Sequence, residues 1–182
     1  MRRTASLLAL LALCATLAHA ETIAFVGGTV HPVSGPAISN ATLVIDGDTI
    51  TSITTGATPP ADARVVDVSG KNLYPGFILP ISLVGITGIS SVRGTEDYSE
   101  IDEVNSDLRA EVAFNPDSFI VPTVLRGGIA YAQPTMRGGT FTGTSAVLRL
   151  DGWHWEDMTV ATPVGMHLVY PRTGGGDDRF VE

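Results

Sequence analysis

The sequence has a single cysteine, Cys14, and it lies inside an N-terminal apolar segment. From residue 21 onward the chain therefore has no thiolate nucleophile, no cysteine metal ligand and no means of forming a disulfide. These absences exclude a disulfide-stabilised fold and a cysteine-dependent hydrolase, so any fold must depend on a hydrophobic core.

Basic residues are also scarce. The chain contains 11 lysine and arginine residues against 19 acidic ones, and Lys71 is the only lysine. The formal net charge is −8 and the isoelectric point is about 4.8. Phosphate backbones are bound by clustered Lys and Arg, so this balance excludes nucleic acid as an expected partner.

The one long apolar run, Leu7–Leu17, is too short to cross a bilayer as a stable helix. It follows the positive pair Arg2-Arg3 and precedes Ala18-His19-Ala20, a small-x-small pattern typical of signal peptidase sites. We therefore predict that residues 1–20 are a signal peptide and that the mature chain begins at Glu21. Removal of the two arginines lowers the net charge from −8 to −10.

Two alternatives to a cleaved signal remain open, an uncleaved N-terminal anchor and a lipoprotein modified at Cys14. Leu13 stands before that cysteine, where a lipoprotein would have a small residue. The sequence favours cleavage, with no stable membrane anchor afterwards, and a periplasmic or secreted protein.

Residues 22–74 show the pattern of a small all-β unit. Asp46-Gly47 stands between two β-branched runs and predicts a tight hairpin turn, because glycine tolerates positive φ. Short strands separated by turn residues are typical of a small sandwich or open barrel. The expected strands lie at residues 23–30, 41–45, 48–53 and 64–68.

The pattern changes after Pro75-Gly76. Phe77–Val84 is apolar on both faces, as strands of a covered parallel sheet are. Asn115-Pro116 predicts a helix start, with the helix running to residue 124 or 125 and Pro122 inside it. Ile129–Ala132 follows as a second buried strand, so the order predicts a parallel βαβ unit. Further strands are expected at residues 146–150 and 164–170.

Three segments together resemble the amidohydrolase superfamily, in particular its imidazolonepropionase-like and dihydroorotase-like members. They are the Gly-Gly strand Val26–Val30, the hairpin Val44–Ile53 and the motif Asp67–Ile78. The resemblance extends from residue 22 to about residue 172. It implies an α/β fold with a small composite β-sandwich over residues 21–75. The first strands of an incomplete TIM-type (β/α) barrel would follow over residues 76–182.

The resemblance also implies a hydrolase that acts on non-peptide carbon–nitrogen bonds. Members of the superfamily carry Asp-x-His-x-His on the first barrel strand, where two histidines bind a divalent metal from one face. In this sequence Ile81 and Leu83 occupy the two histidine positions. Neither side chain can coordinate zinc, so we expect no metal, no other cofactor and no metal-activated water, and the catalytic residues stay unknown.

The residues after Tyr74 are too few for the roughly 250 of a complete barrel. We therefore expect an N-terminal portion that is inactive by itself, partnered by a missing barrel half or by further copies of the chain. A non-catalytic periplasmic binding or scaffold protein derived from the same fold is the alternative. Reading the DNA beyond codon 182 for further histidine and aspartate codons would distinguish the two.

Arg93 and Arg137 are the candidate substrate-binding residues. Each follows an expected barrel strand, and the carboxyl ends of barrel strands carry function. An arginine there could hold the carboxylate of a small-molecule ligand with two parallel hydrogen bonds, although a surface or salt-bridged arginine is the simpler interpretation.

Neither the histidines nor the acidic stretch shows metal-ligand spacing. These residues are His31, His154, His167 and the acidic residues between 96 and 103.

Overall fold

The computed structural model describes residues 21–89 and 91–170, so the predicted signal peptide lies outside the described residues. The chain divides into two compact units, one ending at Pro75 and the other beginning at Gly76. Within the described ranges, no helix has the length and apolar character needed to cross a membrane.

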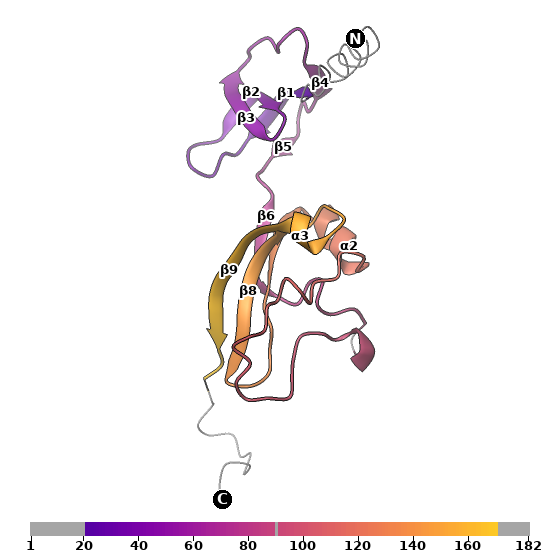
Figure 1. Ribbon diagram of the computed structural model, residues 1–182. Coiled ribbons are helices and arrows are strands. Elements are labelled where there is room, and N and C mark those ends of the chain that lie inside the picture. Colours follow the sequence, from indigo (N-terminus) through magenta and orange to yellow (C-terminus); the bar gives the residue numbers. More distant parts are fainter. Residues whose placement is uncertain (1–20, 90, 171–182) are drawn as a thin grey trace, which may run out of the picture. The chain divides into compact units, whose positions relative to one another are not determined.

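The first unit is one mixed sheet with the order β3-β2-β1-β4, and β5 pairs with the far end of β1 (Figure 1). β1 runs antiparallel to β2, and β2 runs antiparallel to β3, whereas β4 and β5 run parallel to β1. The strands are β1 (Thr22–Val30), β2 (Ile38–Asp46), β3 (Thr49–Thr55), β4 (Arg64–Asp67) and β5 (Asn72–Leu73).

Two glycines shape this sheet. Gly47 adopts φ +57° in the turn between β2 and β3, which confirms the hairpin predicted from Asp46-Gly47. Gly27 adopts φ +86° where the register of β1 against β2 shifts, which is the geometry of a β-bulge. The bulge bends β1, so its first half pairs with β4 and its last two residues pair with β5.

The hydrophobic core of the first unit is small and centres on β1 and β2. Val30, Ala41 and Leu43 are buried there, and side chains such as Phe25 and Ile53 pack against them. His31 stacks on Tyr74 with ring centroids 4.4 Å apart, and its Nε2 lies 2.9 Å from Asn72 Oδ1. This histidine is thus held by packing and by an amide.

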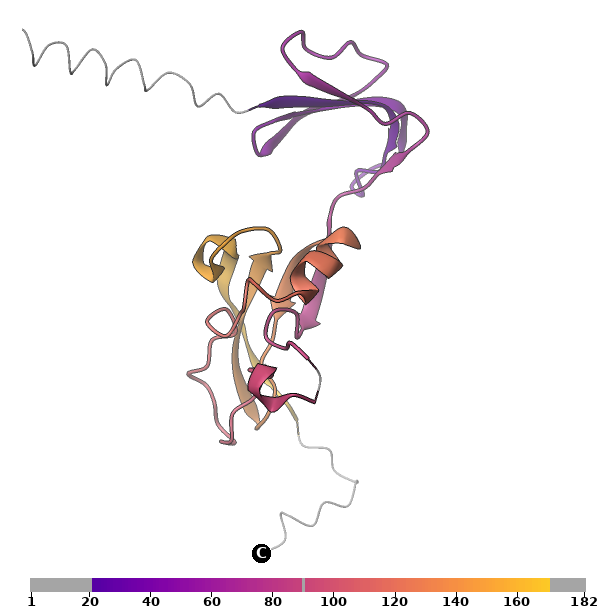
Figure 2. The ribbon, with the colours of Figure 1, turned by 90° about the vertical axis from the view of Figure 1, so that its right-hand side faces the viewer.

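The second unit is built on a four-stranded sheet with the order β6-β7-β8-β9 (Figure 2). β6 and β7 are parallel and joined through α2, which confirms the predicted βαβ unit; β8 and β9 continue the sheet antiparallel. The elements are β6 (Phe77–Ser82), η1 (Arg93–Thr95), α2 (Ile120–Arg126), β7 (Ile129–Pro134), β8 (Phe141–Arg149), α3 (Trp155–Met158) and β9 (Thr159–Leu168).

The helix between β6 and β7 begins later than predicted. α2 starts at Ile120, because Asn115 Oδ1 accepts a hydrogen bond from the Asp117 N–H at 3.0 Å and forms a local turn instead of a helix cap. Pro122 consequently lies in the first turn of α2. A proline is tolerated there because the first backbone N–H groups of a helix have no acceptor within the helix.

A long irregular connection between β6 and α2 packs along the sheet of the second unit. Backbone hydrogen bonds hold it there, for example Ala110 N–H to Thr144 O at 2.9 Å and Arg137 N–H to Tyr98 O at 2.6 Å. The connection also supplies core residues that pack against the sheet. The buried core comprises Val84, Ile86, Ala110, Phe114, Val121, Ala132, Met136, Ala146, Leu148, Leu150 and Met158.

The two outer strands of this sheet expose apolar side chains in the described structure. Phe77 and Ile78 on β6 are 61% and 63% exposed, and Leu168 on β9 is 53% exposed.

The predicted fold class, an all-β part followed by the first strands of a barrel-type sheet, is confirmed. Beyond β7 the described strands run antiparallel, so β6 and β7 are the one parallel pair in residues 76–89 and 91–170.

Candidate functional site

The carboxyl ends of β6 and β7 meet at one edge of the sheet, where Ser82 pairs with Pro134. In barrel enzymes this edge carries the chemistry. The expectation that Ile81 and Leu83 share a face of a regular strand is wrong. Ile81 adopts φ +49° and is 66% exposed, β6 ends at Ser82, and Leu83 packs against the buried core.

A cavity of about 350 Å³ opens at this edge. It includes Ile81 and Ser82 from the end of β6, and Arg137 from the loop after β7. No aspartate or glutamate is among its described lining residues, so its charged group is a cation. The remaining lining residues are Thr135, Met136, Gly138, Thr142, His167, Leu168 and Val169.

His167 is oriented by a short polar network. Its Nε2 lies 2.7 Å from Ser145 Oγ, and Gln133 Nε2 donates to the same hydroxyl oxygen at 2.9 Å. A serine next to a histidine could suggest nucleophilic catalysis. Ser145 is completely buried, however, and it is not among the residues that line the cavity. The network therefore holds the imidazole in place at the cavity wall.

Thr142 adds an unsatisfied group to the same cavity. The residue is 1% exposed, and its Oγ1 has no hydrogen-bond partner among the described residues. Buried hydroxyls are normally hydrogen-bonded, because an unmade bond costs about 1–3 kcal/mol. An orphaned hydroxyl in a cavity wall can bond a ligand.

The structure separates the two arginines predicted to bind substrate. Arg137 is exposed at the cavity, and within residues 21–89 and 91–170 its guanidinium makes no ion pair. Arg93 is the first residue of η1, is exposed, and is not among the lining residues of this cavity. The long connection after β6 carries Arg93 away from the strand end.

The described residues contain no group of three or more His, Cys, Asp or Glu side chains that could hold a metal ion. His31 lies in the first unit, whereas His154 precedes α3 and His167 lies on β9. The acidic residues between 96 and 103 form no such group either.

Glu111 is the polar feature that the sequence did not reveal. Its side chain is completely buried, and three donors converge on Oε1: Arg109 Nε at 2.8 Å, Arg109 Nη2 at 2.7 Å and Thr162 Oγ1 at 2.7 Å. Oε2 has no partner among the described residues. Burial raises the pKa of the Glu111 carboxyl, but the Thr162, backbone and Arg109 hydrogen bonds outweigh it and hold the pKa below its ordinary value.

No protein-family model and no curated protein matches this chain. Among solved structures, the chain is similar to an amidohydrolase from Thermotoga maritima MSB8, with a TM-score of 0.77 and 22% sequence identity. The match covers 82% of this chain and 39% of that one, so this chain spans about two fifths of the length of the Thermotoga protein.

Two other structures match over less of the fold. A prolidase complexed with N-methylphosphonate-L-proline has a TM-score of 0.44 and 23% identity, with 62% of this chain and 25% of that chain covered. A molinate hydrolase has a TM-score of 0.38 and 20% identity, with 62% and 23% covered. The Thermotoga structure confirms the resemblance stated from the motifs: this chain has an amidohydrolase-like fold.

Proposed function

We propose that this amidohydrolase-like protein binds a small carboxylate ligand at the carboxyl ends of β6 and β7, and that the part described here does not hydrolyse carbon–nitrogen bonds by itself. One observation carries the proposal. The cavity at that edge combines an arginine, Arg137, that forms no ion pair with the described residues, and an isoleucine, Ile81, at a position where the superfamily has a metal-binding histidine.

The chemistry of the two histidine positions argues against metal-assisted hydrolysis. A catalytic zinc needs three protein ligands and an open position for water, and imidazole, thiolate or carboxylate groups supply them. Ile81 and Leu83 present hydrocarbon only. We therefore propose hydrolysis of non-peptide carbon–nitrogen bonds as an activity of the lineage. In this protein, other residues would have to restore that activity.

The composition of the cavity wall supports an anionic ligand. Arg137 presents a planar fork of donors that matches a carboxylate, and a second donor is available from the Thr142 hydroxyl. The apolar wall formed by Ile81, Met136 and Leu168 suits the hydrocarbon part of the ligand. A volume of about 350 Å³ lies in the range of small-molecule sites.

Export to the periplasm or the medium is part of the same proposal. Its support is the sequence of residues 1–20, with its paired arginines, apolar run and small-x-small end. The ligand would then be a small carboxylate from the cell envelope or the medium. The excess of acidic over basic residues argues against a nucleic-acid partner.

Substitution of Arg137 tests the binding proposal. We expect benzoate or succinate to bind the full chain in titration calorimetry, and Arg137→Gln to weaken binding at least about tenfold through loss of the charged bidentate contact. Arg93→Gln removes an equal charge outside the cavity and should leave the affinity unchanged. Equal losses in the two variants, or failure of both carboxylates to bind, would reject the proposal.

A further inference from the structure

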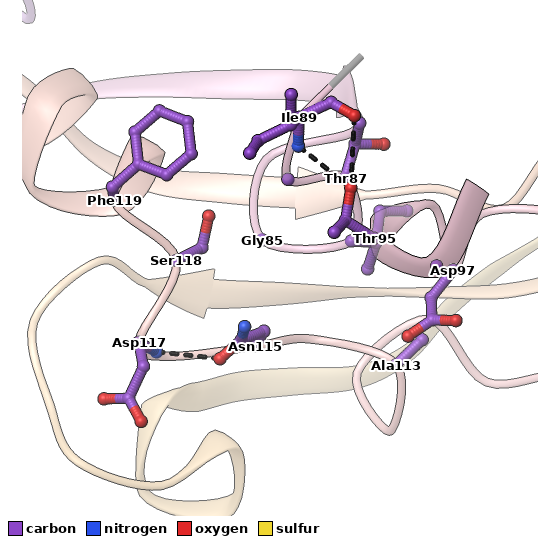
Figure 3. A pocket seen from close by; sticks show the side chains of 13 residues that line it. Gly85, Thr87, Ile89, Thr95, Asp97, Ala113, Asn115, Asp117, Ser118 and Phe119 are labelled. Carbon is purple, nitrogen blue, oxygen red and sulfur yellow. Dashed lines mark hydrogen bonds between the residues drawn. The ribbon is translucent and has the colours of Figure 1, made fainter. Parts of the chain in front are cut away.

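A second cavity of about 350 Å³ lies in the same unit and shares no lining residue with the first (Figure 3). Its walls are residues 85–89 and 94–97, which follow β6, and residues of the segment 113–119 that leads into α2. Backbone hydrogen bonds fix these walls, with Asn115 N–H donating to Gly85 O at 2.8 Å and Asp97 N–H donating to Ile86 O at 3.0 Å. The cavity is thus a built feature of the unit.

Two hydroxyl groups in this cavity lack partners. Ser118 is 7% exposed, and neither its Oγ nor Thr87 Oγ1 has a hydrogen-bond partner among the described residues, although both atoms are buried. In Figure 3 the Ser118 hydroxyl points toward the space that separates it from Thr87 and Ile89. Two such hydroxyls in the wall of one cavity can form hydrogen bonds to a bound group.

The charge of the cavity wall has one sign. Asp97 and Asp117 carry carboxylates on opposite sides of the view in Figure 3, and the described lining residues include no lysine, arginine or histidine. The described residues contain no group of three metal-ligating side chains, which disfavours a metal ion. At the rim, Phe119 is 62% exposed and Ile89 is 56% exposed, so an apolar surface adjoins the carboxylates.

We propose that this cavity binds a small primary amine with an apolar body. An ammonium group has three donors and no acceptor, so it matches carboxylate and hydroxyl oxygens together. The body of the ligand would lie against Phe119 and Ile89, where the aromatic face also attracts a cation. This site takes the opposite charge to the Arg137 cavity and does not depend on the function proposed there.

Binding of 2-phenylethylamine to the full chain tests this inference, with 2-phenylethanol as the uncharged probe of the same shape. By ligand-detected NMR titration we expect the amine to bind and the alcohol to bind at least about tenfold more weakly. Asp97→Asn should weaken amine binding by a similar factor. Asp151→Asn makes the same charge change at an exposed position outside the cavity and should leave amine binding unaltered. Equal binding of amine and alcohol, or equal losses in the two variants, would overturn the proposal.

Ser118→Ala separates ligand binding from folding. Because the Ser118 hydroxyl has no partner among the described residues, its removal should keep or raise the melting temperature of the free protein while it weakens binding of 2-phenylethylamine. A lower melting temperature with unchanged amine affinity would show that the hydroxyl has a structural role only, and that the cavity is not an amine site.

Discussion

Replacement of Gly85 by alanine is expected to destabilise the second unit by about 3–4 kcal/mol. Gly85 adopts φ +80°, a conformation that costs an alanine about 1–2 kcal/mol. A Cβ there would also overlap the Phe114 ring, which is 3% exposed and belongs to the core. Over-packing of that kind costs about 1–3 kcal/mol more.

Urea unfolding followed by tryptophan fluorescence measures this effect. Gly94→Ala is the matched control, because a Cβ at Gly94 meets no atom within 4 Å and that residue has no positive φ. The control should change the free energy of unfolding by less than about 0.5 kcal/mol. If both variants unfold at the same urea concentration, the packing of Phe114 on Gly85 is not as described.

Glu111→Ala is the second large expected loss, about 3 kcal/mol. The substitution leaves a cavity where a fully buried side chain stood, and it removes the acceptor of Thr162 Oγ1 and of the Arg109 guanidinium. Glu100→Ala, at an exposed position of the same connection, should cost less than about 0.5 kcal/mol. Similar unfolding midpoints for the two variants would contradict the assigned role of Glu111.

The pH dependence of stability tests independently how the Glu111 carboxylate contributes to folding. Its pKa in the folded protein is lowered from the ordinary value of 4.5, so its contribution to stability is complete above pH 4.5 and is lost as the pH falls through the folded pKa. Glu111→Gln keeps the volume but cannot titrate. Between about pH 3 and pH 5 the variant should lose less stability than the wild type. Parallel profiles would show that the carboxylate is not stabilised by its donors.

Local signals in the sequence were sufficient for much of the fold. Asp46-Gly47 predicts its hairpin because the turn requires positive φ, and the runs at Phe77 and Ile129 predict a parallel pair because both faces are apolar. The start of α2 was predicted too early, because an asparagine side chain such as that of Asn115 can either cap a helix or form a local side-chain turn. Residues far away in sequence decide between those uses.

The site was less accessible to prediction. The sequence places Arg93 and Arg137 after strands, but the path of the connection between residues 84 and 119 decides that Arg137 alone lines the cavity at the strand ends. The burial of Glu111 depends on Thr162, about fifty residues further along the chain, and no local pattern marks it. Orphaned hydroxyls such as that of Ser118 are likewise visible only once the fold is known.

We propose that this amidohydrolase-like fold has no metal ligands at the two histidine positions of its first barrel-type strand. The most direct test is elemental analysis of the chain purified without an affinity tag, because a polyhistidine tag would carry its own metal. With Ile81 and Leu83 at the ligand positions, the protein should contain far less than one zinc per chain, even after incubation with zinc. About one zinc per chain, lost when His154 or His167 is replaced, would contradict the account and indicate a hydrolase built on other ligands.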